Sequence, residues 1–522
     1  MTSEILVEQP PARFNMAAYA IGRAAAERPA APALLVVDDA AAGSPAEVWT
    51  FAELQDAVLR VAGALRASGL EPGARILIRL DNTSAYALLF FGAIAGGFVP
   101  LPTSSQLTEH EARFLLEDSG AQAAALGRGS LDLSDIPAGV RLFEADEIAR
   151  MIATGRMAAY ADTASDDPAF LIYTSGTTAS PKGVLHGHRS AFGRRPMYQG
   201  WYGIGPNDRM LHAGAFNWTF TLGTGLTDPW VNGATSIIYT GEKDPALWPR
   251  LITQTGATLF AAVPGLYRQI LKYAEPGPGD LGALRHGLMA GETPPPGLFE
   301  GWKDRTGREI YEALGMSEIS TYVSASPTVP RKDGAVGTAQ AGRRVVVLPQ
   351  EGGTDPLPFG EEGLLAVHRS DPGLMLGYWN RPDEETAVYR GDWFIGGDIA
   401  AMDEDGYVFH RGRANDLMKA LGYRVSPLEV EAVLAGHPDV AEVACAEVRV
   451  RDDVSVIGAF IVPRPGVSAD TSEIERFAME QLAAYKRPRA FVLVDSLPRT
   501  ANGKVMRSRL VLPTPSVPRR SS

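Results

Sequence analysis

The sequence has little cysteine and a deficit of basic residues. Cys445 is the single cysteine among 522 residues, which excludes an intrachain disulfide and a zinc site of several thiolates. A lone thiol fits a reducing compartment. Because 49 Lys and Arg stand against 61 Asp and Glu, the net charge is −12. This balance argues against a broad nucleic-acid-binding surface, so we expect no nucleic-acid partner.

The sequence also lacks an uninterrupted apolar run that is long enough to cross a membrane. Its longest uncharged stretch, 82–108, has the required length, but a glycine pair and two prolines interrupt it. We predict a buried helix over 85–95, followed by a glycine turn and a short strand. Residues 1–12 lack the basic and apolar regions of a secretory signal. These features predict a cytoplasmic protein without integral membrane association.

Short apolar strands and helices alternate along the first part of the chain. The β-rich runs are 75–80, 169–173, 235–239, 259–263 and 285–289, and the helical patterns include 51–68, 247–255 and 266–274. This alternation predicts an α/β fold of layered, mainly parallel sheets. Beyond Gly337, three β-rich runs separated by turn residues indicate an antiparallel β subdomain that closes the large domain: 343–348, 363–368 and 407–411.

A smaller domain follows the large one. The predicted boundary separates an N-terminal domain, 1–414, from a C-terminal domain, 415–522. Helical patterns at 427–436 and 471–482 alternate with strand patterns in the second domain, which predicts a small α+β unit. Its tail, 513–522, is rich in Pro, Arg and Ser, and we expect it to be disordered.

The most informative segment joins an apolar strand to small hydroxylated residues and glycine. Residues 171–185 read Leu-Ile-Tyr-Thr-Ser-Gly-Thr-Thr-Ala-Ser-Pro-Lys-Gly-Val-Leu. Backbone N–H groups in such a loop can point at phosphate oxygens, while hydroxyls add donors and a lysine adds charge. The spacing differs from a Walker A loop, because no Gly-Lys-Ser/Thr is present. We predict that phosphate is bound by Thr174, Ser175, Gly176, Thr177, Thr178 and Lys182.

This segment resembles the signature loop of the acyl-adenylate-forming enzymes, which include acyl-CoA synthetases, peptide-synthetase adenylation domains and beetle luciferases. The resemblance starts from Thr174-Ser-Gly-Thr-Thr-x-x-Pro-Lys-Gly183 and extends over nearly the whole chain. Ala179 stands where the family usually has Gly. The resemblance implies an AMP-binding domain joined by a hinge to a mobile C-terminal domain. It also implies ATP, Mg²⁺ and coenzyme A as cofactors.

Two further segments resemble the adenine and magnesium segments of that family: Ala-Gly-Glu-Thr at 290–293 and Glu-Ala-Leu-Gly-Met-Ser-Glu at 312–318. Mg²⁺ prefers oxygen ligands, and Glu318 matches the carboxylate that holds it. The resemblance places Ser317 near the α-phosphate and Glu312 against the adenine amine. A leucine and a serine stand where the family often has an aromatic residue and a threonine. The ATP-binding residues implied here are Gly291, Glu292, Thr293, Glu312, Ala313, Leu314, Gly315, Met316 and Ser317.

The resemblance also assigns ribose, hinge and thioester positions near the end of the chain. Asp398 and Arg413 match the ribose-binding pair, in which a carboxylate accepts both hydroxyls and an arginine assists it. Asn415 matches the hinge, where Asp or Lys is usual. Gly422 and Tyr423 fall in the loop that faces coenzyme A during thioester formation. The catalytic residues that the resemblance implies are Thr174, Glu318 and the adenylation lysine, Lys504.

An acid pocket is expected around residues 211–226, which resemble the segment that carries part of the family's acyl pocket. Its aromatic side chains suit a flat apolar slot, although each also fits an ordinary core position. The chain looks closest to benzoate-type and medium-chain acyl-CoA ligases, and no residue selects a ring over a short alkyl chain. The predicted pocket residues are Phe216, Trp218, Phe220, Ala290 and Gly315.

Several patterns have simpler explanations than function. The segment 277–282 fits Gly-x-Gly-x-x-Gly, but it follows a helix pattern, so we expect no dinucleotide site there. Of His186 and His188, one is expected to pack beside the phosphate loop rather than bind a metal. Glu429 and Glu431 are expected to lie on a solvated helix face. Cys445 is expected to be a core thiol.

These residues together predict an ATP-dependent acid:CoA ligase that works in two steps. The acid would attack the α-phosphorus to give acyl-AMP and pyrophosphate, and the CoA thiol would then give acyl-CoA and AMP. The small domain would rotate about Asn415 between the steps. A carrier-protein thiol in place of CoA and a non-catalytic nucleotide-binding protein stay open as alternatives. The expected partners are the carboxylic acid and CoA, and a homodimer stays open.

Overall fold

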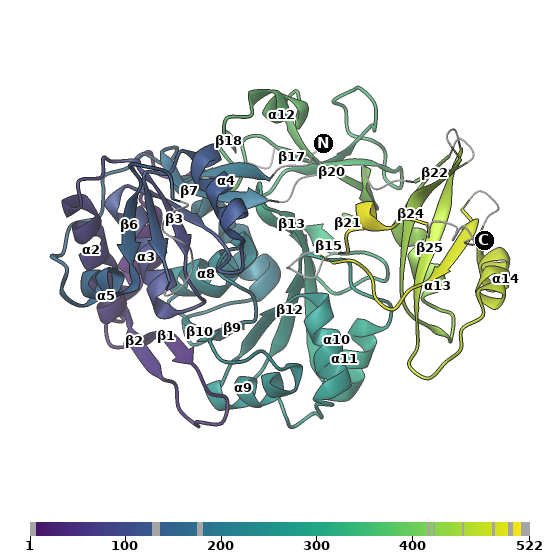
Figure 1. Cartoon of the computed structure of the whole chain (residues 1–522), viewed down its shortest axis with the longest axis horizontal. Coiled ribbons are helices and arrows are strands. Elements are labelled where there is room, and N and C mark those ends of the chain that lie inside the picture. The colour runs from purple at the N-terminus through teal and green to yellow at the C-terminus, as the bar shows by residue number, and fades with distance from the viewer. Residues whose placement is uncertain are drawn as a thin grey trace, which may run out of the picture.

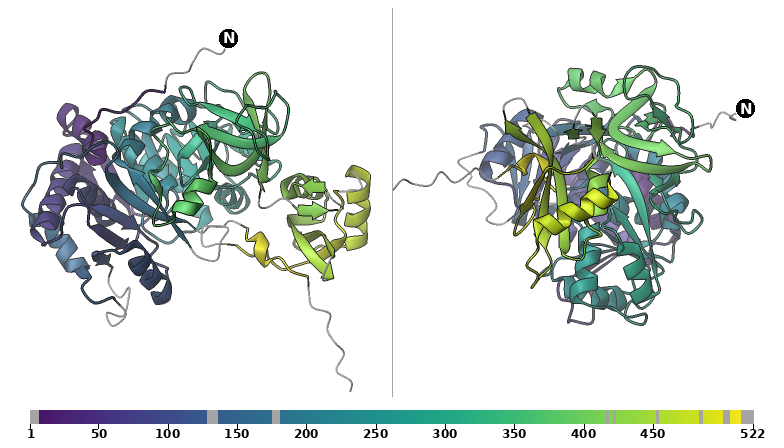
Figure 2. Two further views of the ribbon diagram at one scale, coloured as in Figure 1. Left: turned by 90° about the horizontal axis from the view of Figure 1, so that it is seen from above. Right: turned by 90° about the vertical axis from the view of Figure 1, so that its right-hand side faces the viewer.

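The computed structural model describes residues 7–127, 136–174, 181–414, 418–420, 423–451, 454–482, 486–499 and 505–512. A large N-terminal part, built from layered sheets and helices, lies beside a smaller C-terminal part (Figure 1). Figure 2 shows the smaller part at one end of the molecule. This arrangement confirms the predicted fold class, a large α/β domain followed by a small α+β domain. The exact boundary stays a prediction, because Asn415 lies outside the described residues.

A parallel four-stranded sheet with its helices forms one end of the N-terminal part (Figure 1). Its strands, in the order β4-β3-β5-β6, are β4 (Val99–Pro102), β3 (Arg75–Arg79), β5 (Ala123–Leu126) and β6 (Arg141–Glu144). The nearby helices are α1 (Arg23–Glu27), α2 (Phe51–Ala67), α3 (Ser84–Gly96), α4 (Glu109–Ser119) and α5 (Ala145–Thr154). As predicted, α3 is a buried helix, and it packs against α2. In the described part of the chain, no helix is both long and apolar enough to cross a membrane.

A second, fourteen-stranded sheet runs through the N-terminal part, and its first half is mostly parallel. The strands of this half are β2 (Glu47–Thr50), β1 (Pro32–Val37), β10 (Thr235–Tyr239), β9 (Arg209–His212), β11 (Leu259–Ala262), β12 (His286–Ala290) and β13 (Glu309–Met316). Side chains from three helices form a hydrophobic core with this half: α9 (Trp248–Thr255), α10 (Pro264–Tyr273) and α11 (Leu298–Thr306). Because β11, β12 and β13 are parallel, their carboxyl ends meet at the same edge.

The second half of this sheet is antiparallel. Its strands are β14 (Ser320–Ser324), β15 (Gly337–Ala339), β21 (Tyr407–Arg413), β20 (Trp393–Met402), β19 (Tyr389–Arg390), β17 (Gly363–His368) and β16 (Val345–Leu348). The antiparallel strands predicted beyond Gly337 are therefore present, but they continue the main sheet rather than forming a separate one. The reason is the β13–β14 hairpin, which reverses the chain direction without leaving the sheet.

A small antiparallel sheet carries the predicted phosphate loop. Its strands are β7 (Pro168–Thr174), β8 (Lys182–Gly187) and β18 (Gly377–Tyr378). Thr174 at the end of β7 lies opposite Lys182 at the start of β8. The loop therefore joins two antiparallel strands, and its residues Ser175, Gly176, Thr177 and Thr178 lie outside the described residues.

The C-terminal part is a small α+β unit, as predicted. Its strands are β22 (Met418–Ala420), β23 (Tyr423–Val425), β24 (Val440–Arg451), β25 (Val454–Pro463) and β26 (Ala490–Leu493). Its helices α13 (Pro427–Leu434) and α14 (Thr471–Gln481) share a hydrophobic core with β24 and β25. Cys445 lies fully buried in that core, which confirms the interpretation as a core thiol, and burial raises the pKa of the thiol.

Candidate active site

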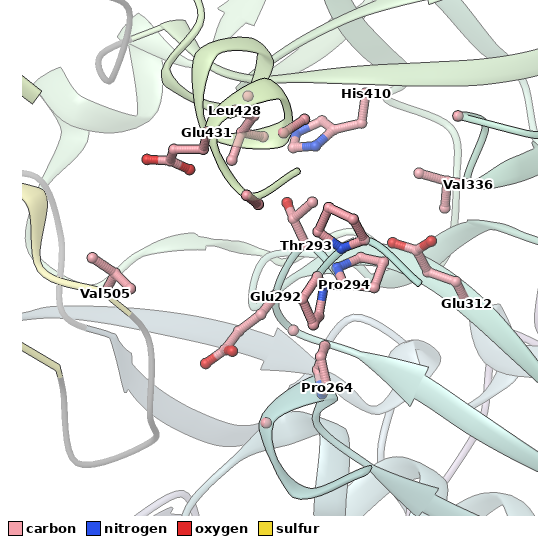
Figure 3. A pocket seen from close by; sticks show the side chains of 18 of the residues that line it. Pro264, Glu292, Thr293, Pro294, Glu312, Val336, His410, Leu428, Glu431 and Val505 are labelled. Atoms are coloured by element: carbon pink, nitrogen blue, oxygen red, sulfur yellow. The ribbon is translucent and has the colours of Figure 1, made fainter. Parts of the chain in front are cut away.

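A cleft of about 590 Å³ lies between the two parts of the chain. Its walls come from the ends of β12 and β13, from β20 and β21, and from α13 and β24. Figure 3 shows Thr293 and Glu312 on one side of the cleft, with Glu431 and Val505 across from them. The cleft gathers most of the predicted adenine and ribose residues: Gly291, Glu292, Thr293, Glu312, Ala313, Leu314, Gly315, Asp398 and Arg413.

The adenine segments come together because β12 and β13 are parallel neighbours. Ala290 at the end of β12 lies opposite Ala313 of β13, so the turn after β12 borders the residues from Glu312 onward. Gly291 opens that turn at φ +100°, and a Cβ atom there would lie 2.6 Å from Cη2 of Trp218. Glycine is thus required both by the backbone conformation and by the approach of the Trp218 ring.

Glu312 is the carboxyl group that the motif places against the adenine amine. Burial raises the pKa of Glu312 from 4.5 to about 8, and Arg331 opposes this shift. Arg331 also lines the cleft, where its guanidinium lies 3.6 Å from the ring centroid of Phe299. With a pKa of about 8, the Glu312 carboxyl is mostly protonated at neutral pH.

The predicted ribose pair is a pair of cross-strand neighbours on β20 and β21. Asp398 is buried, lies opposite Arg413, and has Oδ1 3.8 Å from Nε of Arg413. Nη2 of Arg413 donates to the carbonyl of Gly396 at 2.7 Å, which orients the guanidinium. His410 is a third member that the sequence reasoning missed, with Nε2 3.1 Å from Oδ1 of Asp398. The three side chains present a carboxylate flanked by two nitrogen-bearing groups, which suits a pair of vicinal hydroxyls.

Glu318 lies at the hairpin turn between β13 and β14, and neighbouring segments fix it there. The hydroxyl of Tyr378 donates to Oε1 of Glu318 at 2.6 Å, and the amide of Met375 donates to the Glu318 carbonyl at 2.7 Å. Burial, together with the charge of Glu318, raises the pKa of Tyr378, so the phenol remains a donor. Tyr378 was missed in the sequence, because none of the motifs includes it.

The two remaining residues of that magnesium segment take different places. Ser317 lines a second, smaller cavity, and its carbonyl accepts a hydrogen bond from His186 at 2.8 Å. Met316 packs against Gly396 of β20, whose carbonyl accepts from Arg413. His186 lies on β8, directly beyond the phosphate loop, where it stacks on Phe170 at 4.6 Å between ring centroids. This placement agrees with the prediction that one histidine packs beside the loop.

Lys182 forms an ion pair at the base of the predicted phosphate loop. Its ammonium group pairs with Glu384 of α12 (Pro382–Ala387) and lies 4.9 Å from the centroid of the Tyr378 ring. The phosphate-loop lysine and the Glu318 carboxylate therefore both contact Tyr378. This brings the base of the predicted phosphate loop next to the predicted magnesium ligand.

The three aromatic residues of the predicted acid pocket do not all lie together in the structure. Trp218 and Phe220 meet edge to face at 5.3 Å and belong to the core cluster that contains Ala290. Phe216 is buried in a different cluster, 5.5 Å from Tyr86 between ring centroids. Two of the three aromatic side chains thus lie together beside the cleft segment at Gly291, while Phe216 packs into the neighbouring core.

The C-terminal part supplies the opposite wall of the cleft. Glu431 was expected on a solvated helix face, and that expectation is wrong: it lines the cleft, pairs with Arg507 at 2.8 Å and accepts from the amide of Cys445 at 2.6 Å. The chain beyond β26 returns to α13, a long-range contact that a helix pattern cannot show. Tyr423 lies in β23. Asn415, Gly422 and Lys504 lie outside the described residues.

Comparison with protein families identifies the class. Residues 21–379 match the AMP-binding enzyme family, and residues 429–504 match the AMP-binding enzyme C-terminal domain. The chain therefore belongs to the AMP-binding enzyme family, which confirms the resemblance read from its motifs.

Individual relatives show which members of this family the chain is similar to. The chain is 31% identical to the benzoate–CoA ligase of Thauera aromatica, with 96% of each chain covered. It is 29% identical to the mitochondrial acyl-coenzyme A synthetase ACSM2 of Rattus norvegicus, covering 96% of this chain and 92% of the relative. The chain is thus an enzyme whose named relatives are CoA ligases and synthetases.

Solved structures agree with these relatives. The ATP-bound RpMatB-BxBclM chimera B3 matches with a TM-score of 0.87 at 27% identity, covering 95% of this chain and 97% of that chain. The benzoate CoA ligase from Burkholderia xenovorans LB400 matches with a TM-score of 0.84 at 29% identity, covering 95% and 99%. The similarity in fold therefore extends over both parts of the chain.

Proposed function

We propose that this enzyme is an ATP-dependent acid:CoA ligase that forms an acyl-AMP and converts it to an acyl-CoA. One observation carries the proposal: the cleft gathers the Gly291 turn, Glu312, the Asp398–Arg413 pair and the segments on both sides of Lys504. These residues lie far apart in the sequence and would be needed together only if one nucleotide contacts them all. The benzoate–CoA ligase relative, matched over 96% of each chain, supports the same activity.

In the first step, the proposed roles follow from the donors and acceptors present. Asp398 accepts the ribose hydroxyls, Arg413 assists, and Glu312 accepts from the adenine amine. The Glu318 carboxylate fits Mg²⁺, because this ion is commonly held by one or two carboxylates together with phosphates and waters. When bound, Mg²⁺ would supply positive charge that offsets the phosphate charge. Lys182 at the base of the phosphate loop adds a second positive charge, so catalysis is electrostatic and positional.

In the second step, the proposal follows the family pattern. The C-terminal part rotates about Asn415, which removes Lys504 from the cleft and brings Gly422 and Tyr423 to it. The CoA thiol then attacks the acyl-AMP carbonyl and AMP leaves. Such a rotation separates two chemistries that need different groups at one site.

The proposed substrate is an aromatic, benzoate-like acid or a medium-chain carboxylic acid. Two features support this range: the pair of Trp218 and Phe220 beside Gly291, and relatives named for each kind of acid. The aromatic pair offers an apolar, flat-sided surface. Coenzyme A and the acid are the proposed partners, and the proposed compartment is the cytoplasm, with which a chain that has one cysteine and no disulfide is compatible.

The step assignment is tested by Lys504→Ala. We expect acid-dependent acyl-AMP formation to fall by about a thousandfold or more, whereas CoA transfer from supplied acyl-AMP is retained. Lys486→Ala is the matched control, because Lys486 is another lysine of the C-terminal part and pairs with Glu429. Equal loss of both half-reactions in the Lys504 variant would contradict the assignment.

A further inference from the structure

The turn that carries Glu318 contains a residue in an unusual backbone conformation. Ser317, Glu318 and Ile319 connect β13 to β14, and Ser320 follows at φ +73°. Three-residue hairpin connections commonly place a left-handed residue at this point, and glycine is the residue that adopts it without strain. Backbone strain that persists beside a functional residue is a reason to look for what the side chain does.

The hydroxyl of Ser320 is held by a buried guanidinium group. Nη1 of Arg194 donates to Oγ of Ser320. The rest of the Arg194 fork is bound to Asp228, with Nε 2.8 Å from Oδ1 and Nη2 2.6 Å from Oδ2. Tyr202 also donates to Oδ2 of Asp228 at 2.8 Å. The planar guanidinium therefore has a fixed direction, and its remaining nitrogen points at the turn.

This arrangement is costly for the fold. The side chains of Arg194 and Asp228 are only 8% and 0% exposed. A buried ion pair is often no more stable than well-packed apolar side chains of similar volume. Space for it also requires Gly223, since a Cβ atom there would overlap Cζ of Arg194. The strained Ser320, the buried pair of Arg194 with Asp228 and the required Gly223 thus form one connected arrangement at the turn. This arrangement argues for a role beyond packing.

Other contacts of the turn show what the arginine adds. His186 binds the Ser317 carbonyl at 2.8 Å, and Tyr378 binds the Glu318 carboxylate at 2.6 Å. Those contacts hold the first part of the turn, whereas Arg194 holds the point where β14 begins. Because contacts hold both ends of the turn, the Glu318 carboxylate is held in one orientation. Without the second contact, the start of β14 can adopt other backbone conformations, because serine is strained at φ +73° and glycine there has a wider conformational range.

We propose that Arg194, oriented by Asp228, is a positioning residue that sets the direction of the Glu318 carboxylate through the hydroxyl of Ser320. This inference rests on the proposed function, in which Glu318 is the magnesium ligand. It assigns a role to a buried ion pair, Arg194 with Asp228, that does not line the nucleotide cleft but reaches it through Ser320, which packs against Gly315 of the cleft.

The test is Ser320→Gly. Glycine adopts the left-handed conformation without strain, which offsets part of the stability lost when Nη1 of the buried Arg194 loses its acceptor, the Ser320 hydroxyl. The matched control is Ser324→Ala on the same strand, which removes a buried hydroxyl that donates to the Gly200 carbonyl at 2.6 Å. That variant should lose stability without altering the turn.

The measurement is the thermal unfolding midpoint at fixed ATP and increasing Mg²⁺, without any acid. For the Ser320 variant, we expect the Mg²⁺ concentration for half-maximal stabilisation to rise about tenfold, as for other residues that orient metal ligands. The Ser324 control should keep the wild-type Mg²⁺ midpoint. Asp228→Asn, which releases the guanidinium, should shift the Mg²⁺ midpoint in the same direction as Ser320→Gly.

Three outcomes would overturn the inference. An unchanged Mg²⁺ midpoint in the Ser320 variant would show that the Arg194 contact is structural only. An equal shift in the Ser324 control would show that the midpoint follows stability rather than positioning. If the wild type itself gains no Mg²⁺-dependent stabilisation from ATP, the proposed function fails and the inference fails with it, and this third result is distinguishable because it needs no variant.

Discussion

At the scale of single residues, two of the carboxyl groups that line the cleft, those of Asp398 and Glu312, have opposite electrostatic surroundings. Asp398 lies beside the nitrogen atoms of His410 and Arg413, at 3.1 and 3.8 Å. Glu312 lines the same cleft near Arg331, and burial raises its pKa to about 8. Asp398 is therefore suited to accept hydrogen bonds from hydroxyl groups, whereas Glu312 changes its charge within the physiological pH range.

Glu312 gives a pH-dependent prediction. An ionised carboxylate accepts a hydrogen bond from the adenine amine more strongly than a neutral carboxyl group, so AMP affinity should rise as pH increases from 7 to 9. The folded-state pKa lies above the unfolded value of 4.5, so the stabilisation from Glu312 is complete below about pH 4.5 and is lost as pH rises through about 8. Calorimetric AMP titrations across this range test the first effect. Glu312→Gln should give a flat pH profile, and a rise that persists in this variant would contradict the role.

Residue motifs identified nine of the residues that line the cleft, but they missed partners whose positions depend on distant backbone. Both Asp398 and Arg413 follow from their motifs and lie together. His410 stands three residues before Arg413, which places them on opposite faces of a regular strand. A β-bulge in the register between β20 and β21 at Ile399 and Ala400 brings both to the same carboxylate. No sequence periodicity predicts such a bulge.

At the scale of elements, the site is built from three places where a strand ends or reverses. The turn after β12 supplies Gly291, the β13–β14 hairpin supplies Glu318, and the β7–β8 hairpin holds Lys182 at its base. β12 is fully buried, β7 and β8 are largely buried and β13 is partly buried, and the polar residues lie at the strand ends or directly beyond them. The positions of these site residues therefore depend on strand register. A change in one turn should disturb the site before it disturbs the hydrophobic core.

The turn after β12 can be tested with two glycines. Gly291→Ala strains a backbone at φ +100° and pushes against Trp218, whereas Gly307→Ala strains a backbone at φ +69° with no atom within 4 Å. We expect both to lose about 1 kcal/mol or more of stability from the backbone, and the first to lose about 1–3 kcal/mol more. Only Gly291→Ala should weaken AMP binding.

Thermal unfolding and AMP titration of these two variants supply the measurements. Trp218→Phe removes the ring atom nearest to position 291, so combining it with Gly291→Ala should restore part of the lost stability. Equal AMP affinity in the Gly291 and Gly307 variants would contradict the account of this turn.

The elements themselves were largely predictable, because hydrophobic patterns decide most of them. The predicted helix over 51–68 is α2, and the strand over 235–239 is β10 without any shift. Both lie in segments whose apolar spacing has one clear period. The joining of the antiparallel strands to the main sheet was not predictable, because it depends on the reversal at β13–β14 and on no local pattern.

At the scale of the whole molecule, one carboxylate connects the two parts of the chain. Glu442 of β24 pairs with Arg268 of α10 and with Arg499, each at 2.7 Å. Burial alone would raise the pKa of Glu442, but the hydrogen bonds and charges of Arg499 and Arg268 lower it. The pairing holds the segment that precedes Lys504 against the cleft, which is the arrangement that the proposed first step requires.

Arg268→Ala therefore should slow acyl-AMP formation and spare CoA transfer from supplied acyl-AMP. Because the pair is partly exposed, we expect about a two- to fivefold effect on the first half-reaction. Arg285→Ala is the matched control: its side chain is 41% exposed, as is that of Arg268, and its partner Asp208 lies within the N-terminal part. An equal loss in both variants, or in both half-reactions, would rule out this role.

Buried histidines make the whole molecule sensitive to acid. Burial lowers the pKa of His186, His188 and His286 to about 4 and that of His212 to about 3. Because these values lie below the unfolded value of 6.5, the stabilisation is present above about pH 6.5 and is lost as pH falls toward 4. Glu312 acts in the opposite sense, but it is one group against four.

We expect the free energy of unfolding to fall by more than about 2 kcal/mol between pH 7 and pH 5. Urea unfolding at a series of pH values measures it. His286→Gln should reduce the slope, because it removes one of the groups that take up a proton on unfolding. A flat profile between pH 7 and pH 5 would contradict the burial of these neutral rings.

The most direct measurement of the central claim is pyrophosphate release with ATP and Mg²⁺ across benzoate derivatives, alicyclic acids and C3 to C10 fatty acids, with and without CoA. The account predicts release that depends on one class of acid, with the acid recovered as acyl-CoA when CoA is present. Release that stops at acyl-AMP despite CoA would point instead to a carrier-protein thiol. No release with any acid would contradict the account.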